Sequence, residues 1–458
     1  MPRRDVTNTT PPSIAFSIPL RGFRSKTAWS IAASALFAVI ALAPFKWAMA
    51  QVPTGQEFQP RQPPDNLTPR EREAENYEAR GVHVGSFFLF PTLEADELFD
   101  DNIYASSAGK TASFIQVVRP SLELHSAWSE HMLNLYARGA FGFYSVDGSQ
   151  NYQDLGVGGD GRFDITRDAN VYGGASYNHL HEALGTPNAP NGVSTLSQYN
   201  QLTSNLGYFH RLGRFRTQLD GRVDYFSYND NGAGLAQGVL PNTDRNRTEF
   251  RENLRVGYEF LPGYQIWTSG GLNQRNYDKG VDSLGFAHNS SGWDIVGGFA
   301  VELTSITSFE AFGGYLVQNY VDARFPQISA PTFGLTGYWS PLRQLVVKPY
   351  VRRTIDDSSL AEASGYLNTS AGVDANYKFR PNVQFNMHGE YAVADYQALS
   401  TSSSGRYDQY YTARGEVLYL PTEHFFVGPS YQFVHRTSSQ VGLGYDDNQI
   451  MLRLGARL

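Results

Sequence analysis

Charged side chains recur at every second position along much of this sequence. Between residues 215 and 225 every even position is polar or charged, while leucine, valine and tyrosine occupy odd positions. A period of two places these two sets of side chains on opposite faces of a β-strand. Residues 155–165 and 367–378 repeat the pattern. Arginine and aspartate spaced in this way line a surface with groups that bind water, ions and polar solutes.

No catalytic motif accompanies these charges. The sequence contains no Walker loop, no zinc-ligand spacing and no Gly-x-Ser-x-Gly elbow, and it has no cysteine. A hydrolase would need a nucleophile and a base in contact, and nothing in the chain indicates a pair assembled across strands. We therefore expect no enzymatic activity and no cofactor.

The alternating stretches extend from Gly81 to Leu458 and number about eighteen, an even count as in single-chain bacterial barrels. We expect strands to begin near residues 82, 112, 131, 151, 169, 197, 215, 247, 264, 291, 308, 326, 344, 365, 383, 407, 424 and 445. Short turns alternate with longer segments, which are predicted near 94–111, 183–196, 229–246, 278–290, 357–364, 397–406 and 438–444. Sixteen strands remain an alternative, because proline weakens segments such as 326–339.

This double alternation predicts an all-β fold, an up-and-down antiparallel barrel that spans a membrane. Each strand would show one face to lipid and the other to water, with short periplasmic turns and long extracellular loops. The composition fits such a barrel: 14% of residues are aromatic, 18% are charged, and the mean hydropathy is −0.38. Aromatic residues near the strand ends predict two interfacial girdles.

The first eighty residues differ from the rest. Residues 1–50 combine a basic start, an apolar run from Ala28 to Ala43 and a small-x-small site ending at Ala50, which predicts a signal peptide cleaved near Ala50. An uncleaved anchor is the alternative. Residues 51–80 read as a proline-rich periplasmic linker and a short charged helix over 71–80, either a solvated spacer or a mobile plug or docking element. Residues 81–458 form the barrel.

The net charge excludes one class of partner. The whole chain carries a formal charge of −7, and loss of residues 1–50, which hold mostly basic charges, makes it more acidic. Nucleic acid needs a basic face, so we expect no nucleic-acid partner.

Strand parity assigns a large charged set to the lumen. The pore-lining candidates are Arg119, Arg138, Asp160, Arg162, Asp164, Arg216, Asp220, Arg222, Asp224, Arg251, Arg255, Arg275, Asp294, Glu302, Lys348, Arg352, Asp374, Glu390, Arg414, Glu416 and Arg453. A barrel of 16–18 strands is wide enough to keep such charges hydrated. Their mixed signs favour a polar neutral or weakly charged solute over ion selectivity. The alternative is that many form static cross-strand pairs that hold the wall together.

Two smaller sets complete the predicted site. Tyr136, Tyr144, Phe226 and Tyr228 share the inward parity and are candidates for stacking on sugar rings, or for packing against a folded-in loop. No metal site is predicted. Glu94, Asp96, Asp100 and Asp101 form a weak candidate for a calcium or lipopolysaccharide-bridging cation, since hard cations want several oxygens. A solvated acidic loop is the favoured interpretation, because the spacing matches no EF-hand.

Short motifs add a family resemblance. The stretches 81–91 (GVHVGSFFLFP), 99–104 (FDDNIY) and 118–124 (VRPSLEL), with 161–168 (GRFDITRD), resemble the putative beta-barrel porin 2 family over residues 81–458. The resemblance implies an outer-membrane barrel of Gram-negative bacteria, often encoded beside exopolysaccharide genes. Its implied partners are outer-membrane lipid, lipopolysaccharide, polysaccharide and periplasmic export components. It supplies no active-site residues.

We therefore expect a porin-like channel for a polar solute, with saccharide or exopolysaccharide favoured. The alternative is a structural or surface-binding barrel whose lumen is closed. A TonB-dependent transporter is disfavoured, because residues 51–80 are too few for a plug domain and about twenty-two strands would be needed.

Overall fold

The computed structural model describes residues 79–187, 189, 195–230, 241–304, 306–360, 362–399 and 405–458. The chain divides into two units, Met1–Phe37 and Ala38–Leu458, and all described residues belong to the second. The predicted signal peptide and linker, and the helix predicted over 71–80 except its last two residues, lie outside the described ranges. No helix among the described residues is long and apolar enough to cross a membrane.

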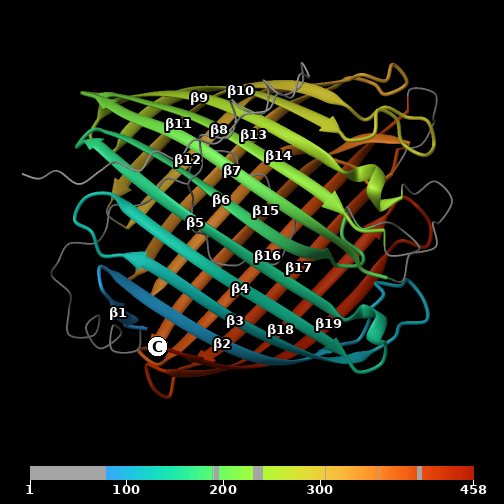
Figure 1. Cartoon of the computed structure of the whole chain (residues 1–458), viewed down its shortest axis with the longest axis horizontal. Helices are drawn as coiled ribbons and strands as arrows, with labels where there is room; N and C mark the ends of the chain where they lie inside the picture. The colour runs from blue at the N-terminus through green and yellow to red at the C-terminus, as the bar shows by residue number, and fades with distance from the viewer. Residues whose placement is uncertain are drawn as a thin grey trace, which may run out of the picture. The chain divides into compact units, whose positions relative to one another are not determined.

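Alternating residues produce a single sheet of antiparallel strands (Figure 1). The strands are β1 (Val82–Val84), β2 (Phe87–Asp100), β3 (Ser113–Ser126), β4 (Met132–Tyr144), β5 (Tyr152–Thr166), β6 (Ala169–Glu182), β7 (Ser197–Leu212), β8 (Phe215–Tyr228), β9 (Arg247–Leu261), β10 (Tyr264–Tyr277), β11 (Ser290–Thr304), β12 (Thr307–Tyr320), β13 (Ile328–Leu342), β14 (Leu345–Asp356), β15 (Ala363–Arg380), β16 (Val383–Ala398), β17 (Tyr407–Tyr419), β18 (Phe425–Ser438) and β19 (Tyr445–Arg457). Two short 3-10 helices, η1 (Gly148–Gln150) and η2 (Asn242–Arg245), follow β4 and β8.

Strands β2 to β19 close into an eighteen-stranded barrel. Each pairs with the next in the chain, and β19 pairs back onto β2 from Gln449↔Asp100 to Arg457↔Thr92. The predicted antiparallel barrel is therefore confirmed at eighteen strands. β13 contributes a full strand although it contains Pro331 and Pro341, so the alternative of sixteen strands is wrong.

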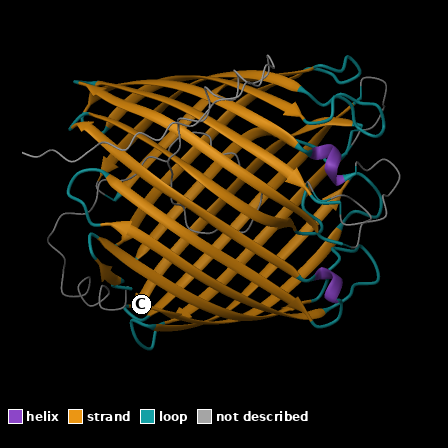
Figure 2. Ribbon diagram, in the orientation of Figure 1, coloured by secondary structure: helices purple, strands orange, loops and turns teal. Residues whose placement is uncertain are grey.

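Turns of two lengths separate the strands, as Figure 2 shows at the two ends of the barrel. The β7–β8 and β9–β10 turns are short, and Gly213 and Gly263 take the positive φ angles of 60° and 79° that such tight reversals require. The opposite end carries the longer segments and both 3-10 helices. We call these the short-turn end and the long-loop end. That they face the periplasm and the outside of the cell, respectively, remains a prediction from the convention of outer-membrane barrels.

The first strand begins later than expected. Residues 82–84 form β1, which pairs only with the beginning of β2, so the first barrel strand starts at Phe87 rather than near residue 82. The long loop expected over 94–111 is also wrong in part, because β2 continues to Asp100. Glu94, Asp96 and Asp100 lie at inward positions of β2, whereas Glu97 lies at an outward position and is exposed. The number of acidic residues alone had suggested a solvated loop.

Burial follows strand parity. On β5, Val157 on the outer face is 52% exposed, whereas Asp160 on the inner face is 1% exposed. Exposed apolar side chains thus form the outer surface that lipid would cover. Two buried apolar clusters lie inside the barrel, one around Ile115 and Tyr152 and the other around Tyr366 and Tyr396.

Candidate functional site

The inner wall of the barrel carries the charged residues that strand parity assigned to it. Each of the pore-lining candidates lies on one of the strands β3 to β19, at a position of inward parity. Lys348 is exposed and stands in register with Asp374 on the neighbouring strand. Their placement on the wall is consistent with a lining role, which remains a prediction.

Most of these charges form ion pairs with opposite charges. The pairs include Arg216 with Glu259 (2.6 Å), Arg222 with Asp224 (2.6 Å), Arg162 with Asp164 (2.8 Å), Arg255 with Glu310 (2.9 Å), Arg251 with Asp294 (3.3 Å), Arg138 with Glu123 (3.6 Å) and Arg414 with Glu416 (3.9 Å). Two of these pairs link strands that are not adjacent: Arg255 with Glu310 joins β9 to β12, and Arg251 with Asp294 joins β9 to β11. The wall therefore presents both signs of charge close together and keeps little excess of either.

Other carboxylates are held by neutral donors. Asn134 donates to Asp160 over 2.6 Å, and Tyr350 donates its hydroxyl proton to Glu390. Asp220 accepts hydrogen bonds from Tyr172 and Gln218. Such networks fix the wall side chains and leave hydrogen-bonding groups facing the lumen.

At the closing seam, β19 and β2 are joined by one arginine. The Arg453 guanidinium lies 3.2 Å from Asp96, 3.4 Å from Glu94 and 3.2 Å from Glu416, and Arg119 also pairs with Asp96. Glu94 and Asp96 are thus neutralised by arginine inside the barrel. This corrects the weak candidate for a cation loop, which had grouped them with Asp100 and Asp101.

The four aromatic candidates differ in how much of each ring is covered. Tyr228 is stacked between Tyr199, at 5.1 Å, and the Arg245 guanidinium, at 4.1 Å. Tyr144 packs into the apolar cluster around Ile115 and Tyr152. The surroundings of these two rings therefore fit the alternative of packing inside the barrel rather than stacking on sugar rings.

Tyr136 and Phe226 each carry a guanidinium over the ring, contributed by Arg138 at 4.3 Å and by Arg247 at 4.5 Å. A sugar ring would have to use the opposite face of either residue. Stacking at these two positions remains a prediction.

The segment Ala183–Pro187 crosses the long-loop end of the lumen, and we call it the crossing segment. It leaves β6, yet Tyr396 on β16 donates to the Pro187 carbonyl over 2.7 Å. Tyr445 and Arg436 donate to the Gly185 carbonyl over 3.4 and 3.5 Å. β6 and β16 are separated by seven strands in one direction around the barrel and by nine in the other. Only a path across the lumen joins them.

Gly185 allows this crossing. Its φ is +80°, and a Cβ there would lie 2.6 Å from both the Ala105 Cβ and the Tyr445 hydroxyl. No side chain larger than hydrogen fits at this position. The sequence shows a glycine in a long loop, but it does not show which wall residues this glycine contacts.

A second segment, residues 357–360, folds inward from the end of β14. Tyr277 donates to Asp357, Arg247 lies 3.4 Å from the same carboxylate, and Arg275 donates to the Ile355 carbonyl over 3.0 Å. Burial alone would raise the pKa of Asp357, but the charges of Arg247 and Arg275 and the Tyr277 hydrogen bond outweigh it and hold this pKa below its usual value.

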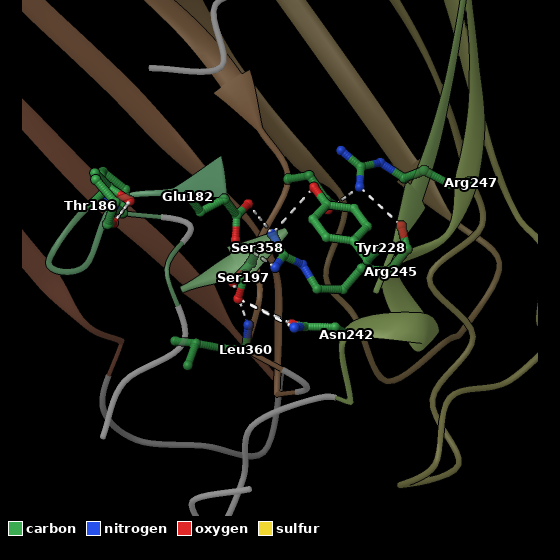
Figure 3. A network of polar contacts seen from close by, with 12 residues as sticks. Glu182, Thr186, Ser197, Tyr228, Asn242, Arg245, Arg247, Ser358 and Leu360 are labelled. Carbon is green, nitrogen blue, oxygen red and sulfur yellow. Dashed lines mark hydrogen bonds and ion pairs between the residues drawn. The ribbon is translucent and has the colours of Figure 1, made fainter. Parts of the chain in front are cut away.

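Figure 3 shows the polar network beside this segment. The Arg245 guanidinium forms two hydrogen bonds with Glu182, of 2.8 and 2.6 Å, and Arg247 donates to the Arg245 carbonyl over 3.1 Å. The network ties the ends of β6 and β9 together. Strand parity did not identify Glu182 or Arg245 as site residues, because Glu182 ends its strand and Arg245 lies in η2.

Three acidic residues meet where the first and last barrel strands pair. Asp100, Asp101 and Asp447 each place a carboxylate oxygen within 4.8 Å of the others, an arrangement able to hold a metal ion. Asp100 and Asp101 belonged to the weak candidate loop, whereas Asp447 did not. Only the pairing of β19 with β2 brings Asp447 to them, and alternation within a strand carries no such signal.

Comparisons with known proteins place the chain in context. The family model described as "Putative beta-barrel porin 2" matches residues 75–458. No curated protein matches the chain. The outer membrane protein opdK of Pseudomonas aeruginosa is similar at 14% identity, with 81% of this chain and 98% of that one covered and a TM-score of 0.41. OccAB3 of Acinetobacter baumannii is similar at 11% identity, with 82% and 100% covered and a TM-score of 0.42. At such values these two structures carry no argument about a solute.

Proposed function

Because this chain belongs to the putative beta-barrel porin 2 family, we propose that its barrel is a channel through which a polar saccharide or an exopolysaccharide strand crosses the outer membrane. The description of the family names a porin, a class of channel without enzymatic activity. Transport would be passive, by diffusion through a hydrated lumen. The chain would reach the membrane of a Gram-negative bacterium after cleavage near Ala50, with lipopolysaccharide around it and export components beneath it.

One observation carries the choice of solute. The inner wall of a closed eighteen-stranded barrel presents arginines and carboxylates in pairs, together with tyrosine hydroxyls and amides. Eighteen strands enclose enough room for water. A wall of paired charges offers donors and acceptors to sugar hydroxyls without strongly attracting either sign of ion. A polar, nearly neutral solute suits this wall better than a salt ion.

The crossing segment sets the width of the path. It spans the lumen near the long-loop end and is held at the far wall by Tyr396, Arg436 and Tyr445. A solute would pass beside it, and its position would limit the solute's cross-section. On the inner wall, Tyr136 and Phe226, each with an arginine over one ring face, would offer stacking steps for sugar rings.

Single-channel recording of the mature protein in planar bilayers tests this function. We expect discrete openings with weak ion selectivity, and shorter openings when a neutral oligosaccharide is added. Tyr136→Ala should weaken the block by oligosaccharide. Phe143→Ala is the matched control, since Phe143 lies on the same strand but faces outward and is 48% exposed. Equal block in both variants would contradict stacking at Tyr136.

A closed barrel that binds polymer or a partner with its outer loops is the second candidate. It is favoured by the inward folding of the crossing segment and of residues 357–360, which both occupy the long-loop end. For a closed lumen, the same recordings would show no openings at any voltage, although the protein inserts as a folded barrel.

A further inference from the structure

We propose that Asp100, Asp101 and Asp447 form a binding site for a hard divalent cation, with Ca²⁺ the best fit, at the long-loop end of the seam that closes the barrel. The site goes beyond the channel function and does not depend on it. One carboxylate ends β2, the next begins the following loop, and the third lies on β19.

Barrel closure brings the three carboxylates together. The register pairs Gln449 of β19 with Asp100 of β2, so Asp447 lies just beyond the end of β2 on the same inner face. Asp101 is held against β19 by its backbone, which donates to the Asn448 carbonyl over 3.1 Å. The carboxylate oxygens of the three residues lie within 4.8 Å of one another. A single ion can contact all three.

Asp447 supplies an independent sign of a ligand. It is only 8% exposed, and its Oδ1 atom is buried without any hydrogen-bond partner. Its other oxygen shares one donor with Asp100, since Gln449 Nε2 donates over 2.8 Å to Asp447 and over 3.1 Å to Asp100. One amide thus serves two buried carboxylates, and one oxygen in this cluster has no protein donor. A buried acceptor of this kind needs a partner that the protein does not provide.

The charges around the cluster support a cation. Within the described ranges, the one lysine or arginine in contact with the trio is Lys110, which lies 3.3 Å from Asp101. Asp100 and Asp447 contact no basic side chain there. By contrast, the buried carboxylate of Asp408, on β17, contacts both Arg406 and Arg436. Two adjacent buried carboxylates without arginine repel each other unless a cation or a proton lies between them.

The ligand set suits calcium. Ca²⁺ takes about six to eight oxygens in flexible geometry, and three carboxylates can supply three to six of them, with water completing the shell. Mg²⁺ demands a near-ideal octahedron and keeps its water, so it fits a set of strand and loop carboxylates less well. Asp101 is only partly buried and leaves the site open to the outside. A bound ion would fasten the first long loop to the last strand.

Terbium luminescence and thermal unfolding test the site in the detergent-solubilised mature protein after chelator treatment. Tyr445 lies two residues from Asp447 on the same face, so a bound Tb³⁺ should show tyrosine-sensitised emission that Ca²⁺ displaces. Ca²⁺ should also raise the unfolding temperature. Asp447→Asn should lose at least tenfold in Tb³⁺ affinity and lose the Ca²⁺-dependent rise.

The adjacent residue provides the control. Asp446 faces outward, is bonded to His435 over 2.5 Å, and has a half-exposed side chain, so Asp446→Asn should behave as the wild type does. If Asp447→Asn fails to fold, Asp100→Asn replaces it, because asparagine can still accept the Asn102 backbone hydrogen bond that Asp100 accepts. Equal Tb³⁺ affinity in wild type and both site variants, or no binding by wild type, would overturn the proposal.

Discussion

Replacing Gly185 by alanine should release the crossing segment from the far wall. Two costs add at this position. The positive φ of +80° costs an alanine about 1–2 kcal/mol. The new Cβ would also lie 2.6 Å from the Ala105 Cβ and the Tyr445 hydroxyl, and overpacking of this kind costs about 1–3 kcal/mol more. The crossing segment is held by hydrogen bonds from Tyr396, Tyr445 and Arg436, each worth about 1 kcal/mol, and by the packing of Leu184 against the cluster around Ile115. We expect a clash of this size to displace the segment.

The assay is single-channel conductance in planar bilayers, with thermal unfolding in detergent measured in parallel. Gly442→Ala is the matched control, because Gly442 has a φ of +87° and its added Cβ meets nothing within 4 Å. The control should lose about 1–2 kcal/mol of stability and keep its conductance. Gly185→Ala should show a larger conductance and admit larger oligosaccharides. If the two variants conduct identically, the crossing segment does not limit the path.

Three further perturbations follow from the wall and its loops. Arg453→Met removes the cation that Glu94, Asp96 and Glu416 share at the seam and leaves Asp96 with Arg119 alone, so the barrel should lose about 3–5 kcal/mol. Urea unfolding in detergent measures this loss, and an unchanged midpoint would contradict the role of Arg453. The pKa of Asp357 is lower in the folded protein than its unfolded value of about 3.9, so the ionised carboxylate stabilises the fold at pH values above about 3.9. This stabilisation is lost as the pH falls through the pKa of Asp357 in the folded protein. The unfolding temperature should therefore fall more steeply below about pH 4 in the wild type than in Asp357→Asn, and parallel curves would refute this. Arg247→Met should remove much of that difference, because Arg247 is a principal cation facing Asp357.

The strands could be predicted with little error because each strand on its own carries an apolar face and a polar face. The observed strands from β3 to β19 begin within two residues of the expected starts. The error at residues 94–100 arose because acidic side chains that face a lumen look, in sequence, like those of a solvated loop. The turns could also be predicted from local sequence, because glycine and proline residues mark tight reversals.

The site was less predictable because its contacts depend on closure and on loops. Parity placed Arg255 on the inner wall but did not pair it with Glu310, three strands away. It gave no sign that Asp357 would reach Arg247, or that Pro187 would meet Tyr396 on the opposite wall. Such partners are chosen by the diameter and stagger of the whole barrel. No single strand contains that information.

Liposome swelling tests the channel most directly. Vesicles that contain the mature protein are diluted into isosmotic solutions of neutral saccharides of increasing size. The account predicts swelling whose rate falls as the saccharide grows, and faster entry of large saccharides with Gly185→Ala. Vesicles that hold correctly folded barrels and show no swelling with any saccharide would contradict it.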